Sequence, residues 1–174
     1  MATGASQPTV EGPLNEGMLR IYLRDHHAAA LGGIELARRT LANNRGTPFE
    51  PALEKLAKDI HEDRLSLERL MKRLGVSPDP VKEAAVWAFE KVSRLKLNGR
   101  VLQYSPLSRV IETETLRSGI DAKRAMWTAL RHIADVDARL DATELGKLER
   151  RADDQRKRVE VIRLEAARLA FSAP

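Results

Sequence analysis

The chain has 174 residues, a length that suits one domain with a substantial core. Hydrophobic residues make up 43% of it but aromatic residues only 4%, so the core must consist mainly of Leu, Ile, Val and Ala, which favours helices over sheets. The absence of cysteine excludes disulfides and thiolate sites, and the dispersed net charge of +5 indicates neither a nucleic-acid nor a membrane partner.

Residues 1–12 are small and polar, and they predict a disordered arm ahead of a single helical domain over 13–174. The arm lacks the basic start and the apolar run of a secretory signal. The uncharged stretch "HHAAALGGI" at 26–34 is far shorter than the roughly 20 apolar residues that cross a bilayer. We therefore expect a cytoplasmic protein.

Proline, glycine and capping residues divide the rest of the chain into helices. A Pro at the first helical position, a Gly after the last one and boxes of the Ser/Thr/Asp-x-x-Glu type mark the expected boundaries. Four long helices are expected, over residues 13–45, 48–74, 106–133 and 142–171, with a shorter helix over 80–98. No stretch alternates polar and apolar residues as a strand does.

The links between these helices predict the topology. Short loops join the first long helix to the second and the third to the fourth, so each pair should form an antiparallel hairpin. The central link contains the 80–98 helix, which is about 27 Å long at 1.5 Å per residue and can travel along the bundle. The expected fold is all-α, an up-down-down-up four-helix bundle with a short crossover helix. A five-helix up-down bundle is the alternative.

Polar residues interrupt the apolar rows that should form the core. Asp63 and Gln155 each replace an apolar residue in the repeat of their helix. Counted from the helix ends, these two lie within roughly 5 Å of one level with His26 and Asp121. His27 points about 100° away from His26, so only one of the two histidines can face that level.

We interpret this level as a hydrogen-bonded polar layer in the core, because buried carboxylates need partners. Arg64, Arg117 or Arg124 would supply the counter-charges. The alternative is a metal site made of His26 or His27 with Asp63 and Asp121, which offer imidazole and carboxylate ligands. No cofactor is indicated, and a bound metal remains the alternative.

The Gly32-Gly33 pair has two interpretations. Glycine inside a helix costs about 1 kcal/mol relative to alanine, so the pair requires a structural reason. The expected reason is a tight crossing with a neighbouring helix. Room for a ligand is the second reason.

The four long helices, the crossover and the mid-bundle polar layer together resemble the ferritin-like superfamily. Members with a di-iron centre use a Glu from each of two helices and a Glu-x-x-His pair from each of the others. This sequence has no Glu-x-x-His, and "DIHEDR" at 59–64 places no histidine three residues after Asp59 or Glu62. The resemblance therefore implies the fold without a di-iron activity.

The expected crossover helix over 80–98 carries residues that could form a contact between two copies of the chain. Trp87 and Phe89 lie off its main apolar face, which suggests contact with a second subunit. The alternative is that "LQYSPL" at 102–107 folds back over Trp87.

Two function classes follow from these features. The first is a non-catalytic bundle that acts through protein contacts or self-association, as a homodimer. The second is a bundle that binds a metal or a small ligand at an atypical mid-bundle site, including a redox enzyme. Nucleic-acid binding is disfavoured, because no basic stripe carries interleaved aromatic residues.

Overall fold

The computed structural model describes residues 14–81 and 104–172. These residues contain no strand and form four α-helices: α1 (Glu16–Asn43), α2 (Glu50–Arg73), α4 (Pro106–His132) and α5 (Ala142–Phe171). The all-helical prediction is confirmed, and the helix bounds agree with it to within a few residues. The N-terminal arm and most of the expected 80–98 helix, including Trp87 and Phe89, lie outside the described residues.

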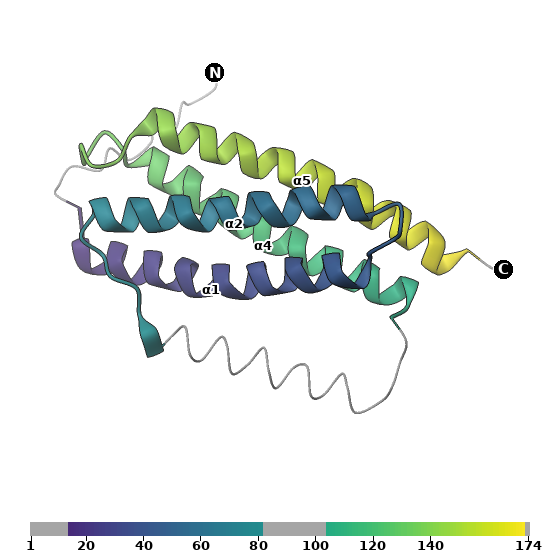
Figure 1. Ribbon diagram of the computed structural model, residues 1–174. Helices are drawn as coiled ribbons and strands as arrows, with labels where there is room; N and C mark the ends of the chain where they lie inside the picture. The colour runs from purple at the N-terminus through teal and green to yellow at the C-terminus, as the bar shows by residue number, and fades with distance from the viewer. Residues whose placement is uncertain (1–13, 82–103, 173–174) are drawn as a thin grey trace, which may run out of the picture.

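The helix directions follow from pairs that join the end of one helix to the start of another (Figure 1). Arg39, late in α1, lies 3.2 Å from Glu112, early in α4. Arg73, at the end of α2, lies 2.7 Å from Glu144, at the start of α5. The helices α1 and α4 are therefore antiparallel, as are α2 and α5. Since α1 and α2 also form an antiparallel hairpin, α2 and α4 run in the same direction, and the order is up-down-down-up.

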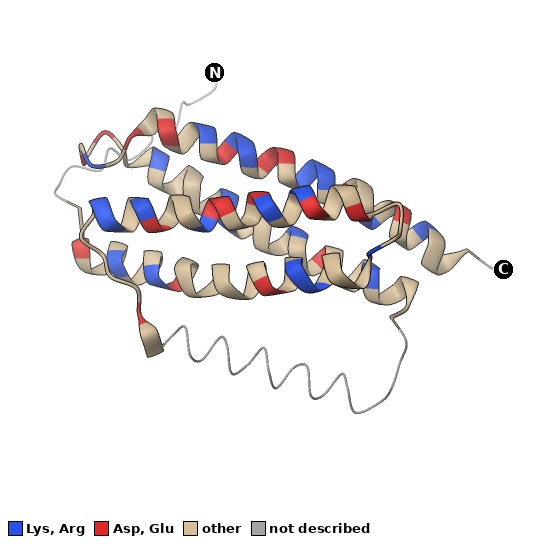
Figure 2. Ribbon diagram, viewed as in Figure 1, with Lys and Arg blue, Asp and Glu red and all other residues tan. Residues whose placement is uncertain are grey.

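The core consists of the apolar rows of all four helices. Leu23, Leu56, Trp127 and Ala152 are each 0% exposed and come from α1, α2, α4 and α5 in turn. Most charged residues lie outside this core, with Asp63 a buried exception, and Figure 2 shows acidic and basic residues alternating along α5. None of the helices in the described part of the chain is both long and apolar enough to cross a bilayer.

A buried polar cluster joins the end of α1 to the start of α4. The Asn44 side chain is fully buried; its Nδ2 donates to the Tyr104 hydroxyl at 2.8 Å, and its Oδ1 accepts from Arg109 Nε. The Tyr104 hydroxyl in turn donates to Glu112 at 3.0 Å. Burial raises the pKa of Tyr104 to about 12, so the phenol keeps its proton and its role as a donor.

Glycine ends α2 in the expected way. Gly75 has φ 67°, the left-handed conformation that glycine adopts without strain. The Val76 N–H donates to the Met71 carbonyl at 2.8 Å, the long bond of a Schellman motif, and the Val76 side chain is buried. This cap turns the chain out of α2 next to α1, where Arg24 Nε donates to the Ser77 carbonyl at 2.8 Å.

The start of α4 offers a test of local capping. Ser105 is the N-cap, and its hydroxyl accepts from the Ser108 N–H at 3.2 Å. Ser105→Ala should lower the free energy of unfolding by about 1 kcal/mol in urea denaturation, because the Ser108 N–H loses its acceptor. Ser105→Gly is the matched control and should cost only a few tenths of a kcal/mol. Equal losses in the two variants would contradict the capping role.

Candidate functional site

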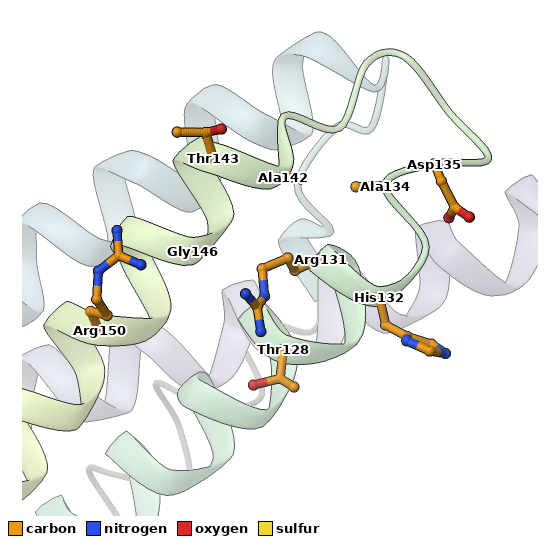
Figure 3. A pocket seen from close by; sticks show the side chains of 9 residues that line it. All are labelled: Thr128, Arg131, His132, Ala134, Asp135, Ala142, Thr143, Gly146 and Arg150. Carbon is orange, nitrogen blue, oxygen red and sulfur yellow. The ribbon is translucent and has the colours of Figure 1, made fainter. Parts of the chain in front are cut away.

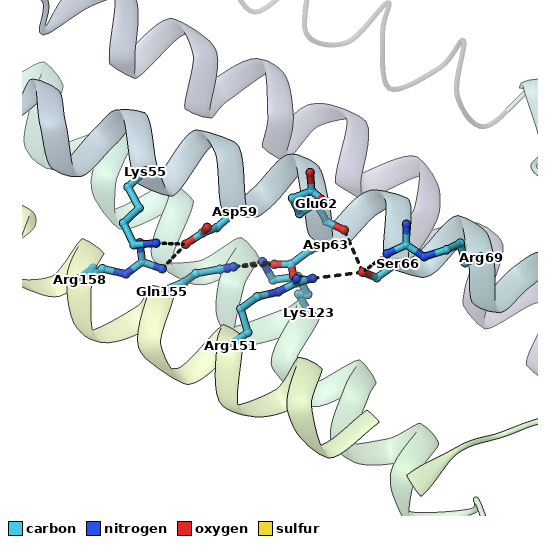
Figure 4. A network of polar contacts seen from close by, with 10 residues as sticks. All are labelled: Lys55, Asp59, Glu62, Asp63, Ser66, Arg69, Lys123, Arg151, Gln155 and Arg158. Carbon is cyan, nitrogen blue, oxygen red and sulfur yellow. Dashed lines mark hydrogen bonds and ion pairs between the residues drawn. The ribbon is translucent and has the colours of Figure 1, made fainter. Parts of the chain in front are cut away.

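The centre of the bundle contains a buried carboxylate bonded to a buried amide. Asp63 of α2 is 2% exposed and Gln155 of α5 is 0% exposed, and Gln155 Nε2 donates to Asp63 Oδ2 at 2.7 Å. Each replaces an apolar residue in its own row, and the antiparallel pairing of α2 with α5 brings the two together (Figure 4). These two residues form the centre of the candidate site.

Two basic side chains approach the same carboxylate from other helices. Lys123 of α4 donates through Nζ to Asp63 Oδ2 and to Gln155 Oε1, and Arg151 of α5 pairs with Asp63 Oδ1. The Arg151 guanidinium also donates to Ser66 Oγ at 3.2 Å. Figure 4 shows these side chains converging on Asp63. One carboxylate therefore faces a lysine and an arginine, with the neutral Gln155 beside them.

The two histidines occupy separate positions on α1. His27 is 1% exposed, and its Nε2 lies 3.1 Å from Glu68 of α2. His26 is partly buried and packs against Tyr22 with 4.6 Å between the ring centroids. Burial lowers the pKa of His26 below its ordinary value and outweighs the opposing field of Asp25. His26 lines the cavity described below.

Asp121 does not belong to the buried layer. Its side chain is 47% exposed and lies 3.9 Å from Arg156 Nε. The reason is the phase of α4, which turns the neighbouring apolar row toward the core and leaves Asp121 on the surface. Lys123 is the α4 residue that enters the layer instead.

The expected counter-charges pair elsewhere. Arg64, Arg117 and Arg124 lie 2.9, 3.2 and 2.9 Å from Glu68, Glu160 and Asp153, respectively. The sequence did carry a signal for Lys123, because it completes the alternating three- and four-residue spacing of the apolar row in α4 (Leu116, Ile120, Lys123, Trp127 and Leu130). It thus interrupts its row in the same way as Asp63 and Gln155 interrupt theirs.

A cavity of about 380 Å³ lies between α1, α2 and α4. Small residues line much of it: Ala29, Ala30, Gly32 and Gly33 on α1, and Ser118, Gly119 and Ala122 on α4. A Cβ atom built on Gly33 or Gly119 would meet no atom within 4 Å. The tight crossing expected at the glycine pair is therefore wrong at Gly33, where the missing side chain leaves space.

The same cavity has a polar side. Asp63 and Lys123 line it together with His26 and Arg64, so the cavity reaches the buried cluster. Trp127 also lines it, is 0% exposed, and has an indole N–H with no hydrogen-bond partner among the described residues. A buried donor without an acceptor costs about 1 to 3 kcal/mol, which an oxygen atom in the cavity would recover.

The charge state of Lys123 reflects its surroundings. Burial lowers the pKa of Lys123, and this effect outweighs the opposing field of Asp63, while the positive charge of Arg151 lowers it further. The Lys123 side chain is 17% exposed, so water contributes little to stabilising an ammonium there.

The residues proposed for a metal site do not converge. Across residues 14–81 and 104–172, no three His, Asp or Glu side chains come together as metal ligands. His27 contacts Glu68 and Asp121 is exposed, which leaves Asp63 with two basic side chains and an amide as its neighbours. The site is thus rich in donors around a single carboxylate.

A second hollow lies at the turn between α4 and α5 (Figure 3). Arg131, His132 and Arg150 line it, but Figure 3 shows Arg150 and His132 pointing away from each other. Arg131 Nε lies 3.1 Å from Glu149. These cations do not converge on a common point, so this hollow is a weaker candidate than the cavity.

Comparisons of the chain with protein-family models, curated proteins and solved structures find no match.

The importance of the buried carboxylate can be tested by truncation. Asp63→Ala should lower the free energy of unfolding by about 3 kcal/mol in urea denaturation, because it leaves Gln155, Lys123 and Arg151 without the acceptor that they share. Asp121→Ala is the matched control and should change the stability by no more than about 0.5 kcal/mol, since Asp121 is exposed. Similar losses in both variants would show that the buried cluster does not stabilise the fold.

Proposed function

We propose that this chain binds a small, largely apolar molecule carrying an oxygen acceptor, in the cavity between α1, α2 and α4. The observation that carries the proposal is Trp127, a buried residue of the cavity lining whose indole N–H has no acceptor among the described residues. Native proteins satisfy nearly all buried donors, so an oxygen of a bound molecule is the natural partner.

The dimensions and lining of the cavity support this proposal. Pockets for small molecules commonly measure about 300 to 1,000 Å³ and combine an apolar wall with a few polar groups, and this cavity has about 380 Å³. Leu36, Leu67, Ile120 and Met126 supply apolar wall, while Lys123 and Asp63 lie on the polar side. This lining suits an apolar body with one polar end.

The proposed architecture is that of a ferritin-like bundle without a di-iron centre. Its support is the parallel course of α2 and α4 and the position of the polar cluster at mid-bundle, where bundles of that class build their sites. The 80–98 crossover helix is part of this proposal.

Cinnamyl alcohol is a suitable probe, because it combines an aromatic body with one hydroxyl oxygen. Wild-type protein should bind it with a rise in melting temperature and a change in tryptophan fluorescence. Gly33→Leu should fill the cavity and abolish both responses, whereas Gly33→Ala should stabilise the unliganded protein by about 0.5 to 1 kcal/mol.

Arg38→Leu is the control for Gly33→Leu, because it adds a leucine at an exposed position of the same helix. It should leave binding intact. Equal binding by Gly33→Leu and wild type would overturn the proposal. So would binding that appears only in the Trp87→Ser, Phe89→Ser double variant, since the cavity would then be filled by the chain's own 82–103 segment.

Self-association as a homodimer is the second candidate function. Its support in the described residues is a group of exposed apolar side chains near the start of α4 and the end of α5, which lie at one end of the bundle. Leu107, Ile111, Val161, Leu164 and Phe171 are 49 to 71% exposed. Exposed apolar patches of this kind often mark protein contacts.

Sedimentation equilibrium tests this second candidate. The wild type should have the mass of a dimer, and Ile111→Ser combined with Leu164→Ser should give a monomer. Ile21→Ser, at an exposed position of α1, is the control and should remain dimeric. The Trp87→Ser, Phe89→Ser variant tests the interface expected from the sequence. A monomeric wild type would refute both interfaces.

A further inference from the structure

The buried cluster holds one more basic group than its carboxylate can neutralise. Asp63 contacts both Lys123 and Arg151, and Gln155 contributes no charge. Arginine is a permanent cation in proteins, and Arg151 pairs directly with Asp63 Oδ1, so this pair is already balanced in charge. A second positive charge on Lys123 would be opposed only by the weaker field of Asp59, in a site that is nearly closed to water.

A neutral amine at Lys123 would avoid this excess charge. Its two observed acceptors agree with this state, because an amine donates two hydrogen bonds, here to Asp63 Oδ2 and Gln155 Oε1. Its nitrogen then retains a lone pair. The downward shift in the pKa of Lys123 on burial acts in the same direction.

The position of Lys123 allows this amine to reach a molecule bound in the cavity. Lys123 lines the cavity and lies one helical turn before Trp127, which lines it too. Residues four apart on a helix project over the same face. Suppose that the oxygen of a bound carbonyl group accepts a hydrogen bond from the Trp127 indole N–H. The carbonyl carbon would then lie on the face of α4 that carries the Lys123 amine.

We propose that Lys123 is a nucleophile that forms an imine with an aldehyde or ketone held in the cavity. This inference rests on the proposed function, since it requires a small molecule in the same cavity. It adds the chemical class of that molecule, which is a carbonyl compound with an apolar body.

The reaction balances without any further reactant. Lys123 Nζ attacks the carbonyl carbon, the C–N bond forms, and the carbonyl π electrons move to the oxygen. Trp127 Nε1–H donates to that oxygen as its negative charge develops, in the manner of an oxyanion donor. Asp63, beside Nζ, accepts the proton released from nitrogen and returns it to the oxygen. Water then leaves with the carbonyl oxygen and the two amine hydrogens, which yields the C=N bond.

Reductive trapping of the wild-type protein tests this inference. The probe is trans-cinnamaldehyde with sodium cyanoborohydride, which at neutral pH delivers hydride to the imine carbon in preference to the free aldehyde and converts the imine into a stable secondary amine. The modified lysine is then identified by peptide mass analysis. At pH 7 we expect Lys123 to be labelled at least about tenfold faster than Lys157, whose side chain is 70% exposed, because an ordinary lysine is neutral in roughly one molecule in 10³ at that pH.

A pH profile separates a reactive amine from a merely accessible one. Labelling of Lys123 should already be substantial near neutral pH, whereas solvent-exposed lysines such as Lys157 react mainly at alkaline pH. Lys123→Arg should abolish selective labelling, and Lys157→Arg should leave it unchanged. Labelling that follows exposure, with Lys157 modified as fast as Lys123 or faster, would overturn the inference.

Cinnamyl alcohol distinguishes this failure from failure of the proposed function. It has the shape of the aldehyde but cannot form an imine. Binding of the alcohol without selective labelling by the aldehyde would refute the nucleophile and leave the cavity as a binding site. Failure of both probes would refute both proposals, and selective labelling of Lys123 that Gly33→Leu abolishes supports both.

Discussion

The bundle depends on one carboxylate that has no access to water. A buried charge is tolerated only when it is paired and hydrogen-bonded, so Asp63 requires its partners at fixed places. Those partners come from α4 and α5, which means that α2 cannot rotate or slide against either helix without leaving the charge unpaired. Apolar rows alone would tolerate a shift of one helical turn. The carboxylate thus fixes the relative height of three helices.

The fourth helix, α1, shares none of the described bonds to this carboxylate, and the cavity follows from that arrangement. Its middle faces α4 across small side chains, so the two helices meet there without filling the space between them. The polar cluster supplies one wall of this space and the tryptophan of α4 another. The cavity therefore has apolar walls and one polar end, because it lies where the small residues of α1 and α4 meet the buried cluster around Asp63.

Much of this structure was predictable from local rules. Helix bounds followed from proline, glycine and capping residues, and the directions of the four helices followed from the lengths of the links. Asp63 and Gln155 were identifiable because each breaks an apolar repeat. The same rule identifies Lys123, which was missed because a lysine whose long apolar stem packs along a helix is normally assigned to the surface. Asp121 was misplaced because two rows of α4 compete for the core, and only packing decides between them.

The cavity was the part that sequence could not decide. Glycines in a helix are compatible with a close crossing or with empty space, and the two differ only in the distance to the neighbouring helix. That distance depends on all the side chains between α1 and α4, so it cannot be predicted from a local sequence pattern. The missing acceptor for Trp127 is likewise a property of the assembled core.

The attachment of α1 has a consequence for how a molecule reaches the interior. Its last residues are tied to α4 through Asn44, and near its start Arg24 is bonded to the segment that follows α2, while Glu16 pairs with Arg139. Between these anchors the helix carries glycine and alanine and lies over the cavity. A helix that is anchored at both ends and contains glycine in its middle bends most easily at the middle. Bending of α1 away from α4 opens the cavity while the two helical hairpins stay together. A small molecule that enters by this route leaves the contacts of Asp63 unbroken, because none of the described bonds to Asp63 comes from α1.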